Sequence, residues 1–226
     1  MDTPISLQSV KVSGSLEEVL RLGVVIFRNL SIGEQNPDLT QAIKGTAEEL
    51  TKSLEHRQPS SLAPVIRSRR LYHHVGLDPT KHRPSSEKLL RRVLKGHPFP
   101  RINDFVDAMN LVSVRLQFPL GLYDWDQLVL PILVRIGSPG EKYQGLSGEM
   151  VNLAGKVLLV DGEGPFGNPT QDSQRSLVGR RSVRALVTIF GPADTPKVEL
   201  EEALQEVVSA GQAYCDGQQV VSGILP

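Results

Sequence analysis

The sequence predicts an α+β fold in one domain, in which helices pack on a mostly antiparallel sheet. Helical patterns flank a late cluster of short apolar runs that are typical of strands. No internal repeat or low-complexity tract interrupts this order. The 226 residues would suffice for one large domain or two small ones. A chain of this length buries roughly 70% of its unfolded surface, which is enough to fold without disulfide or metal staples.

The N-terminal part, residues 1–60, is expected to contribute strands and one long helix. Partial period-two alternation indicates a strand, and a Ser-x-x-Glu spacing indicates a capped short helix. A β-branched apolar run is typical of a buried strand, and Asn-Pro-Asp is typical of a helix start. The predicted elements are a strand at 5–12, a short helix from Ser15 to about Leu22 that Gly23 ends, a strand at 24–32 and a helix from Asn36 to about His56.

Two further helices are expected before residue 100. The first covers about Leu62 to His74. The second opens at Ser85 or Ser86, because a serine hydroxyl there can accept a hydrogen bond from a free amide of the first turn. It ends at Gly96, which supplies a left-handed stop.

A third helix begins near Asn103 and continues to about Leu116, with apolar residues at helical spacing. Asp107 and Asn110 lie within it. Asn and Asp compete for backbone hydrogen bonds, so they weaken a helix unless they bond to something else. Their partner is either a neighbouring loop of the same fold or a ligand.

Mostly strands are expected after a tight polar turn at 119–128. Pro131 favours an edge position for the first of them, because proline cannot donate to a sheet. A last helix is expected in the C-terminal part, residues 191–226, followed by a tail. The predicted elements are strands at 129–136, 157–160 and 183–190, a hairpin at 141–153 that turns at Ser147-Gly148, and a helix from Asp194 to about Tyr214.

Charge is unevenly distributed along a chain whose formal net charge is zero. Residues 67–101 include ten Lys or Arg residues and two acidic residues. Such asymmetry favours a surface that faces a polyanion such as RNA, although solvated helix faces can cluster in the same way. The candidate phosphate contacts are Arg67, Arg69, Arg70, Lys81, Arg83, Arg91 and Arg92.

Residues 84–128 resemble the B3/B4 domain of the phenylalanyl-tRNA synthetase beta subunit. The INDFVDAMN sequence at 102–110 matches an INxxVDxxN helix of that family, and PLGLYDWDQL at 119–128 matches its PL-x-x-[FY]-D-x-D-x-L turn. The similarity continues more loosely to about 176, and the core most similar to the family is 61–190. The resemblance implies a free-standing B3/B4-like domain that binds tRNA or other RNA and that could hydrolyse misacylated tRNA in trans.

The resemblance also implies a proofreading pocket, from which this sequence departs. The family's pocket histidine falls on Gly121, its threonine on Met109 and its glutamate on Gln171, whereas its asparagine is kept as Asn110. Ester hydrolysis requires a positioned water and a stabilised oxyanion. No catalytic residue is therefore assigned, and the alternatives are a non-catalytic RNA-binding module or a small-ligand-binding protein that uses the same cleft.

The polar loop from Asp161 to Arg175 is the best pocket candidate, because turns after buried strands place polar groups at a sheet edge. The alternative is an ordinary turn with a bonded Asp. We expect a cleft between this loop and the Asn103 helix that would take the aminoacyl end of a tRNA. The pocket candidates are Asn103, Asp107, Asn110, Asp161, Asn168, Asp172, Ser173 and Arg175.

Several other functions find little support in the sequence. His73, His74 and His82 have no cysteine at ligand spacing, so we expect no metal. There is no G-x-S-x-G, G-x-G-x-x-G or P-loop, so we expect neither a serine hydrolase nor a nucleotide cofactor. The single Cys215 fits a reducing compartment. No apolar run approaches the ~20 residues that span a bilayer, and no secretory signal is evident, so we expect a cytoplasmic protein without membrane contact.

Overall fold

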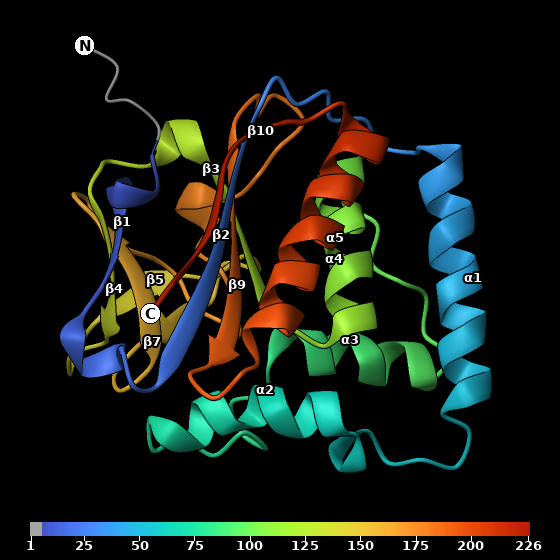
Figure 1. Cartoon of the computed structure of the whole chain (residues 1–226), viewed down its shortest axis with the longest axis horizontal. Helices are drawn as coiled ribbons and strands as arrows, with labels where there is room; N and C mark the ends of the chain where they lie inside the picture. The colour runs from blue at the N-terminus through green and yellow to red at the C-terminus, as the bar shows by residue number, and fades with distance from the viewer. Residues whose placement is uncertain (1–5) are drawn as a thin grey trace.

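A four-stranded antiparallel sheet lies at the centre of the molecule, which the computed structural model describes over residues 6–226 (Figure 1). Its strands come from distant parts of the sequence, so the chain ends and the middle are held together by backbone hydrogen bonds. In spatial order they are β10 (Gln218–Leu225), β2 (Leu20–Arg28), β9 (Ala185–Pro192) and β3 (Leu120–Asp124).

A second sheet packs beside the first. The edge strand nearest the N-terminus pairs in parallel with its neighbour, and the remaining neighbouring strands pair antiparallel. In spatial order the strands are β1 (Val10–Val12), β4 (Ile132–Ile136), β7 (Val157–Asp161) and β8 (Gly164–Gly167), and a separate hairpin joins β5 (Lys142–Gln144) to β6 (Met150–Asn152).

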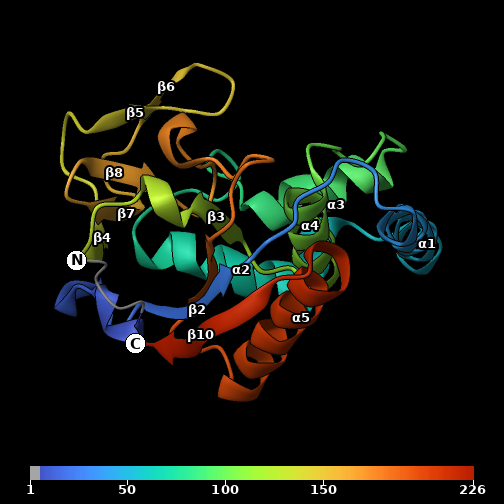
Figure 2. The ribbon, with the colours of Figure 1, turned by 90° about the horizontal axis from the view of Figure 1, so that it is seen from above.

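Residues 6–226 form five α-helices, which pack on the sheets or on one another. Figure 2 shows two of them, α4 and α5, on one side of the central sheet and the second sheet on the other. In Figure 1, α2 lies below the central sheet, α3 lies beneath α4 and α5, and α1 packs outside α3 and α4. The helices are α1 (Pro37–Ser53), α2 (Ala63–His74), α3 (Ser85–Leu94), α4 (Asp104–Leu116) and α5 (Lys197–Cys215).

Burial on both faces explains the continuous apolar sequence of β2. Successive side chains of a strand point to opposite faces. Leu22 and Val24 contribute to the core shared with the second sheet, whereas Val25 and Phe27 contribute to the core beneath α4 and α5. A strand covered on both sides needs no polar alternation, and β2 accordingly has no polar side chain from Leu22 to Phe27.

The predicted α+β class is confirmed, as are the five long helices, whose ends differ from the predicted ones by a few residues. The hairpin is confirmed as well, with Gly148 at a positive φ of 89° in its turn. Three strands, β3, β8 and β10, had no strand counterpart in the prediction, and β10 replaces the expected tail. Among residues 6–226 no helix is long and apolar enough to cross a membrane.

The predictions for the first 32 residues are partly wrong. Instead of a helix from Ser15, a single 3₁₀ turn (Gly14–Leu16) precedes β2, which passes through Gly23 without interruption. The capping-box spacing favoured a helix, but burial of Leu20 and Leu22 in the core decides for a strand. Only Val10–Val12 of the predicted first strand is a strand, and its first residue lies outside the described residues.

Three predictions for the middle of the chain are also wrong. The tight turn at 119–128 is strand β3 followed by a 3₁₀ turn, because it pairs with β9. β4 is an inner strand between β1 and β7, and Pro131 avoids conflict with the sheet by preceding it. α3 begins at Ser85 with Pro84 as its cap residue, so no serine hydroxyl caps it.

Candidate functional site

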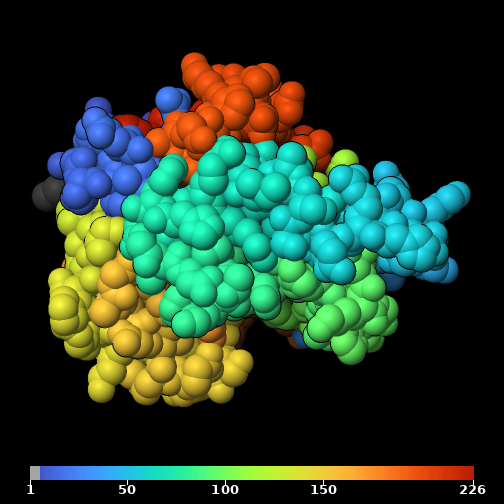
Figure 3. All heavy atoms as spheres, turned by 90° about the horizontal axis from the view of Figure 1, so that it is seen from below, coloured from blue at the N-terminus to red at the C-terminus, as the bar shows by residue number. Residues whose placement is uncertain are grey.

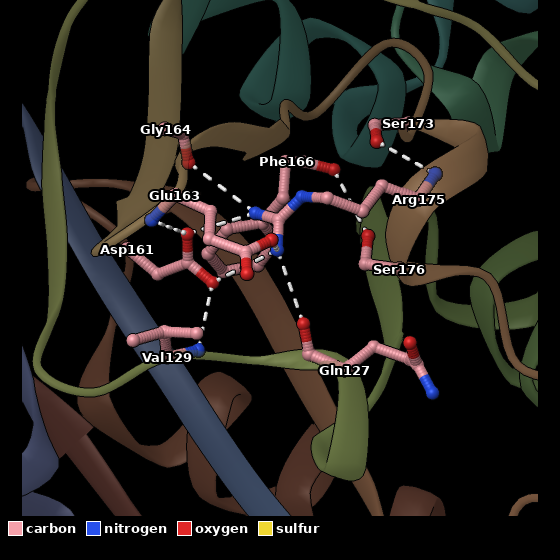
Figure 4. Close-up of polar contacts among 9 residues, drawn as sticks. All are labelled: Gln127, Val129, Asp161, Glu163, Gly164, Phe166, Ser173, Arg175 and Ser176. Carbon is pink, nitrogen blue, oxygen red and sulfur yellow. Dashed lines mark hydrogen bonds and ion pairs between the residues drawn. The ribbon is translucent and has the colours of Figure 1, made fainter.

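An ion pair fixes the first half of the candidate loop (Figure 4). The Asp161 carboxylate, at the end of β7, receives Nη2 of Arg175 at 2.8 Å and Nη1 at 3.2 Å. It also accepts hydrogen bonds from the amides of Val129 at 2.9 Å and Glu163 at 3.0 Å. Its side chain is fully buried. These four donors occupy the carboxylate, which supports a structural role for Asp161 and Arg175, two of the predicted pocket residues.

Arg175 extends this connection to neighbouring segments. Its guanidinium donates to the carbonyl oxygen of Gln127 at 3.0 Å and lies 5.7 Å from the centre of the Phe166 ring. The Ser173 hydroxyl accepts the amide of Arg175 at 3.0 Å, and the Ser176 hydroxyl donates to the carbonyl oxygen of Phe166 at 3.2 Å. The loop is therefore held against the second sheet at both of its ends.

A second polar cluster surrounds Asp172. The Asp172 carboxylate accepts a hydrogen bond from the Tyr123 hydroxyl at 2.8 Å and another from the Leu122 amide at 3.2 Å. Burial of the carboxyl raises the pKa of Asp172 to about 7, although the two hydrogen bonds act in the opposite direction. Burial also raises the pKa of Tyr123 well above its usual value. A carboxyl that titrates near neutral pH can accept a proton as a general base.

Asn168 organises the backbone just before Asp172. Its Oδ1 accepts the amides of Thr170 at 2.8 Å and Gln171 at 3.1 Å, and its Nδ2 donates to the Tyr143 hydroxyl. Tyr143 in turn donates to the carbonyl oxygen of Gln171. The hydroxyls of Thr170 and Tyr72 share a hydrogen bond of 2.9 Å. The loop is thus connected to the β5–β6 hairpin and to α2.

Two glycines make room for the Tyr123 side chain. A Cβ atom at Gly121 would lie 2.1 Å from the Tyr123 hydroxyl oxygen, and a Cβ at Gly167 would lie 2.2 Å from the same atom. A side chain at either position is incompatible with the observed place of Tyr123. The tyrosine hydroxyl therefore fills the space beside position 121, where the resemblance places a pocket histidine.

The candidates on α4 serve a different part of the fold. Asn103 caps α4 by accepting the Val106 amide at 2.9 Å and donates to the carbonyl oxygen of Val178 at 3.1 Å. Asp107 accepts the guanidinium of Arg101 at 2.7 Å and the Ile102 amide at 2.9 Å. Asn103 and Asp107 share no partner with Asp172, so their polar groups support the start of α4. Asn110 is half-buried one turn further along.

Sequence reasoning missed the tyrosines that hold the loop. Tyr72, Tyr123 and Tyr143 belong to three different elements, and each hydroxyl reaches residues 170–172. Alternation in LGLYD signals a strand that buries Tyr123 on one face. The hydrogen bond of its hydroxyl to Asp172, 49 positions away, leaves no trace in the local pattern.

Most of the predicted basic residues form ion pairs with acidic residues of the chain. Glu87 is fully buried and receives Arg69 at 2.7 Å, Arg91 at 2.7 Å and Arg83 at 3.4 Å. Burial by itself would raise the pKa of Glu87, but the hydrogen bonds from Arg69 and Arg91 lower it below the usual value. One buried carboxylate thus holds three arginines that sequence reasoning assigned to phosphates.

Two other arginines of α2 pair with acidic residues in the first turn of α5 or just before that helix. Arg67 forms an ion pair with Glu199 and lies 3.9 Å above the Phe118 ring, and Arg70 contacts Asp194 at 3.1 Å. Figure 3 shows α2, coloured teal, in the middle of this face, with the green α3 segment beside it and a notch between the green and the yellow-gold segments. Lys81 and Arg92 are exposed. Within residues 6–226 no group of three or more His, Cys, Asp or Glu side chains is placed to hold a metal ion.

These features define an α+β domain whose polar loop lies beside a basic helical face. The profile of the family described as "B3/4 domain" matches residues 67–189, more than half of the chain, and the chain belongs to this family. The match begins in α2 and ends in β9, and it includes the Asp172 cluster and Glu87.

The relatives are phenylalanine–tRNA ligase beta subunits. The one from Bifidobacterium longum is 27% identical over 176 residues, which cover 77% of this chain and 19% of the relative. The one from Bartonella henselae is 39% identical over 64 residues, which cover 28% of this chain and 8% of the relative. This chain thus matches about a fifth of those proteins or less.

The fold recurs in a solved structure. An N-terminal fragment of the phenylalanyl-tRNA synthetase beta subunit from Pyrococcus horikoshii superposes with a TM-score of 0.51 and 15% sequence identity. The superposition covers 96% of this chain and 54% of the fragment. At this identity the likeness shows the fold.

Proposed function

We propose that this protein binds tRNA, with the α2–α3 face against the phosphate backbone and the aminoacyl end near Asp172. One observation carries the proposal: the basic face and the Asp172 loop are joined. The Lys88 ammonium donates to the carbonyl oxygen of Thr170 at 3.3 Å, and Thr170 lies two residues before Asp172. The relatives are named as tRNA ligase subunits, which supports tRNA as the polyanion.

The paired arginines would act as a rigid platform. The Glu87 carboxylate balances only one of the three positive charges around it, so the cluster keeps a net positive charge. Arginines held in fixed positions lose little conformational freedom when they meet a phosphate. The exposed Lys81 lies in the loop before α3, near Arg83 in sequence. The exposed Arg92 lies on α3, next to Arg91 in sequence.

The test is equilibrium binding of a tRNA mixture over a range of salt concentrations. Phosphate contacts make log K fall linearly with log salt, and each removed contact reduces the slope by about one. Lys81→Glu with Arg92→Glu should weaken binding by at least about tenfold at low salt. Lys11→Glu, on exposed β1, is the matched control and should leave affinity unchanged. No tRNA binding by the wild type at low salt would refute the proposal.

Hydrolysis of misacylated tRNA is the second candidate, and the pKa of Asp172 near 7 favours it. Asp172 would take a proton from the attacking water as general base. In a deacylation assay, tyrosyl-tRNA made on the phenylalanine acceptor should be hydrolysed faster than in buffer, and Asp172→Asn should remove the acceleration while tRNA affinity is retained. Binding without accelerated hydrolysis would indicate a non-catalytic RNA-binding module. Binding of a small ligand beside Asp172 without any salt dependence would indicate a small-ligand-binding protein.

A further inference from the structure

Three basic side chains from separate segments lie near one another, and two of them lie beside Thr170. Lys88 belongs to α3, His82 to the loop before it, and Lys156 to the connection between β6 and β7. The Lys88 ammonium donates to the carbonyl oxygen of Thr170 at 3.3 Å. Lys156 lines a narrow hollow together with Thr170. Figure 3 shows the teal-green and gold segments that carry these residues side by side on one face.

These charges repel one another. Burial lowers the pKa of His82, and the neighbouring Lys156 lowers it further. Burial likewise lowers the pKa of Lys88, followed by repulsion from Arg83 and Lys156. A folded chain that holds like charges together loses stability unless an anion compensates them.

The nearby carboxylates are engaged elsewhere. Asp78 accepts hydrogen bonds from the amide of Thr80 at 2.8 Å and from its hydroxyl at 2.7 Å, and Glu149 accepts a hydrogen bond from Gln171. Throughout the described part of the chain, Lys88 and Lys156 form no ion pair with a carboxylate. Asp78 and Glu149 add negative charge near the site without forming an ion pair with either ammonium group, so Lys88 and Lys156 can still bind an anion from outside the chain.

We infer that His82, Lys88 and Lys156 form a phosphate-binding site for the RNA backbone. This inference rests on the proposed tRNA binding and specifies where one phosphate is held. Lysine acts on phosphate as a compact point charge with three donors, and an imidazole can add one donor. Because the site adjoins Thr170, the nucleotide next to the held phosphate would lie near Asp172, which would guide the end of the RNA toward the loop.

Salt-dependent tRNA binding tests the site with three single variants. Lys88→Gln and Lys156→Gln should each reduce the slope of log K against log salt by about one and weaken binding about fivefold to tenfold at 0.1 M salt. Lys142 is an exposed lysine on β5, and Lys142→Gln should change neither the slope nor the affinity. If the wild type binds tRNA and both variants retain its slope, the site is refuted while tRNA binding stands.

A second measurement does not depend on RNA. The pKa of the His82 imidazole can be measured by NMR titration. Inorganic phosphate added to the wild-type protein should raise this pKa, because a bound anion favours the charged ring. Lys156→Gln should weaken this response several-fold. If tRNA does not bind but phosphate raises the pKa of His82, the proposed function fails and the anion site stands. If phosphate leaves the His82 titration unchanged, the site is refuted.

Discussion

The most informative prediction concerns the stability of Asp172 variants as pH changes. Burial raises the pKa of Asp172 from 3.8 to about 7. A group whose pKa is higher in the folded state contributes stability that is fully present below its unfolded pKa and is lost as the pH rises through its folded pKa. Because each pKa unit corresponds to about 1.36 kcal/mol, this rise corresponds to a loss of roughly 4 kcal/mol between about pH 4 and pH 7. Asp172 keeps some contact with solvent, which screens its charge, so this figure is an upper value.

The measurement is urea unfolding from pH 4.5 to pH 8, followed by fluorescence of Trp125, the single tryptophan, which is 6% exposed. Asp172→Asn removes the titrating group but keeps an oxygen that can accept a hydrogen bond. The free energy of unfolding of the wild type, relative to this variant, should fall by about 1.4 kcal/mol per pH unit and level off above about pH 7. Asp38→Asn, at the exposed start of α1, controls for general effects of removing a carboxyl.

A second variant makes the test sharper. The hydrogen bond from Tyr123 lowers the pKa of Asp172, so Tyr123→Phe should move the pH window of the stability loss upward. A constant stability difference between wild type and Asp172→Asn from pH 4.5 to pH 8 would refute the reasoning. It would mean that Asp172 has an ordinary pKa in the folded protein, and the case for a general base would fall with it.

Three further predictions concern stability and can be measured by urea unfolding at pH 7. Glu87→Gln should cost about 3–5 kcal/mol, because it leaves three partly buried guanidinium groups without their carboxylate; a loss below about 1 kcal/mol would contradict this. Gly121→Ala should destabilise strongly because its Cβ would lie 2.1 Å from the Tyr123 hydroxyl oxygen, whereas the matched Gly45→Ala, whose Cβ meets nothing within 4 Å, should stabilise α1 by about 0.5–1 kcal/mol. Asn103→Ala should cost about 1–2 kcal/mol through loss of the α4 cap, and a neutral effect would contradict the cap.

Local signals sufficed for the helices because their boundaries are set by nearby residues. The α1 start at Asn36 and the α3 stop at Gly96 depend on capping and on a positive φ of 71° at Gly96. The strands depend on distant partners. β10 is half exposed and weakly patterned, and it exists because it pairs with β2 along its length. Residues Gly121 to Tyr123 resemble a turn in sequence and become a strand through β9.

The candidate site shows the same difference between local sequence signals and contacts with distant residues. Asp161, Asn168 and Asp172 were found because polar residues after a buried strand must bond to something, and all three are bonded in the structure. The identity of their partners was not predictable, because Arg175 is local but Tyr123 and Tyr143 come from other elements. The α4 polar residues followed the structural alternative that the sequence left open: Asn103 and Asp107 bond to neighbouring loops.

The count of basic residues along the chain overstated the charge that is free to meet RNA. Glu87, Glu199 and Asp194 pair with five arginines of α2, α3 and the loop between those helices, so these arginines contribute mainly to packing and a fixed field. Lys88 and Lys156 have no carboxylate partner among the described residues, yet only one of them lies in the basic segment. We therefore expect uncompensated charge, rather than the density of basic residues in sequence, to decide where a phosphate binds, and the proposed phosphate site lies next to the loop that carries Asp172.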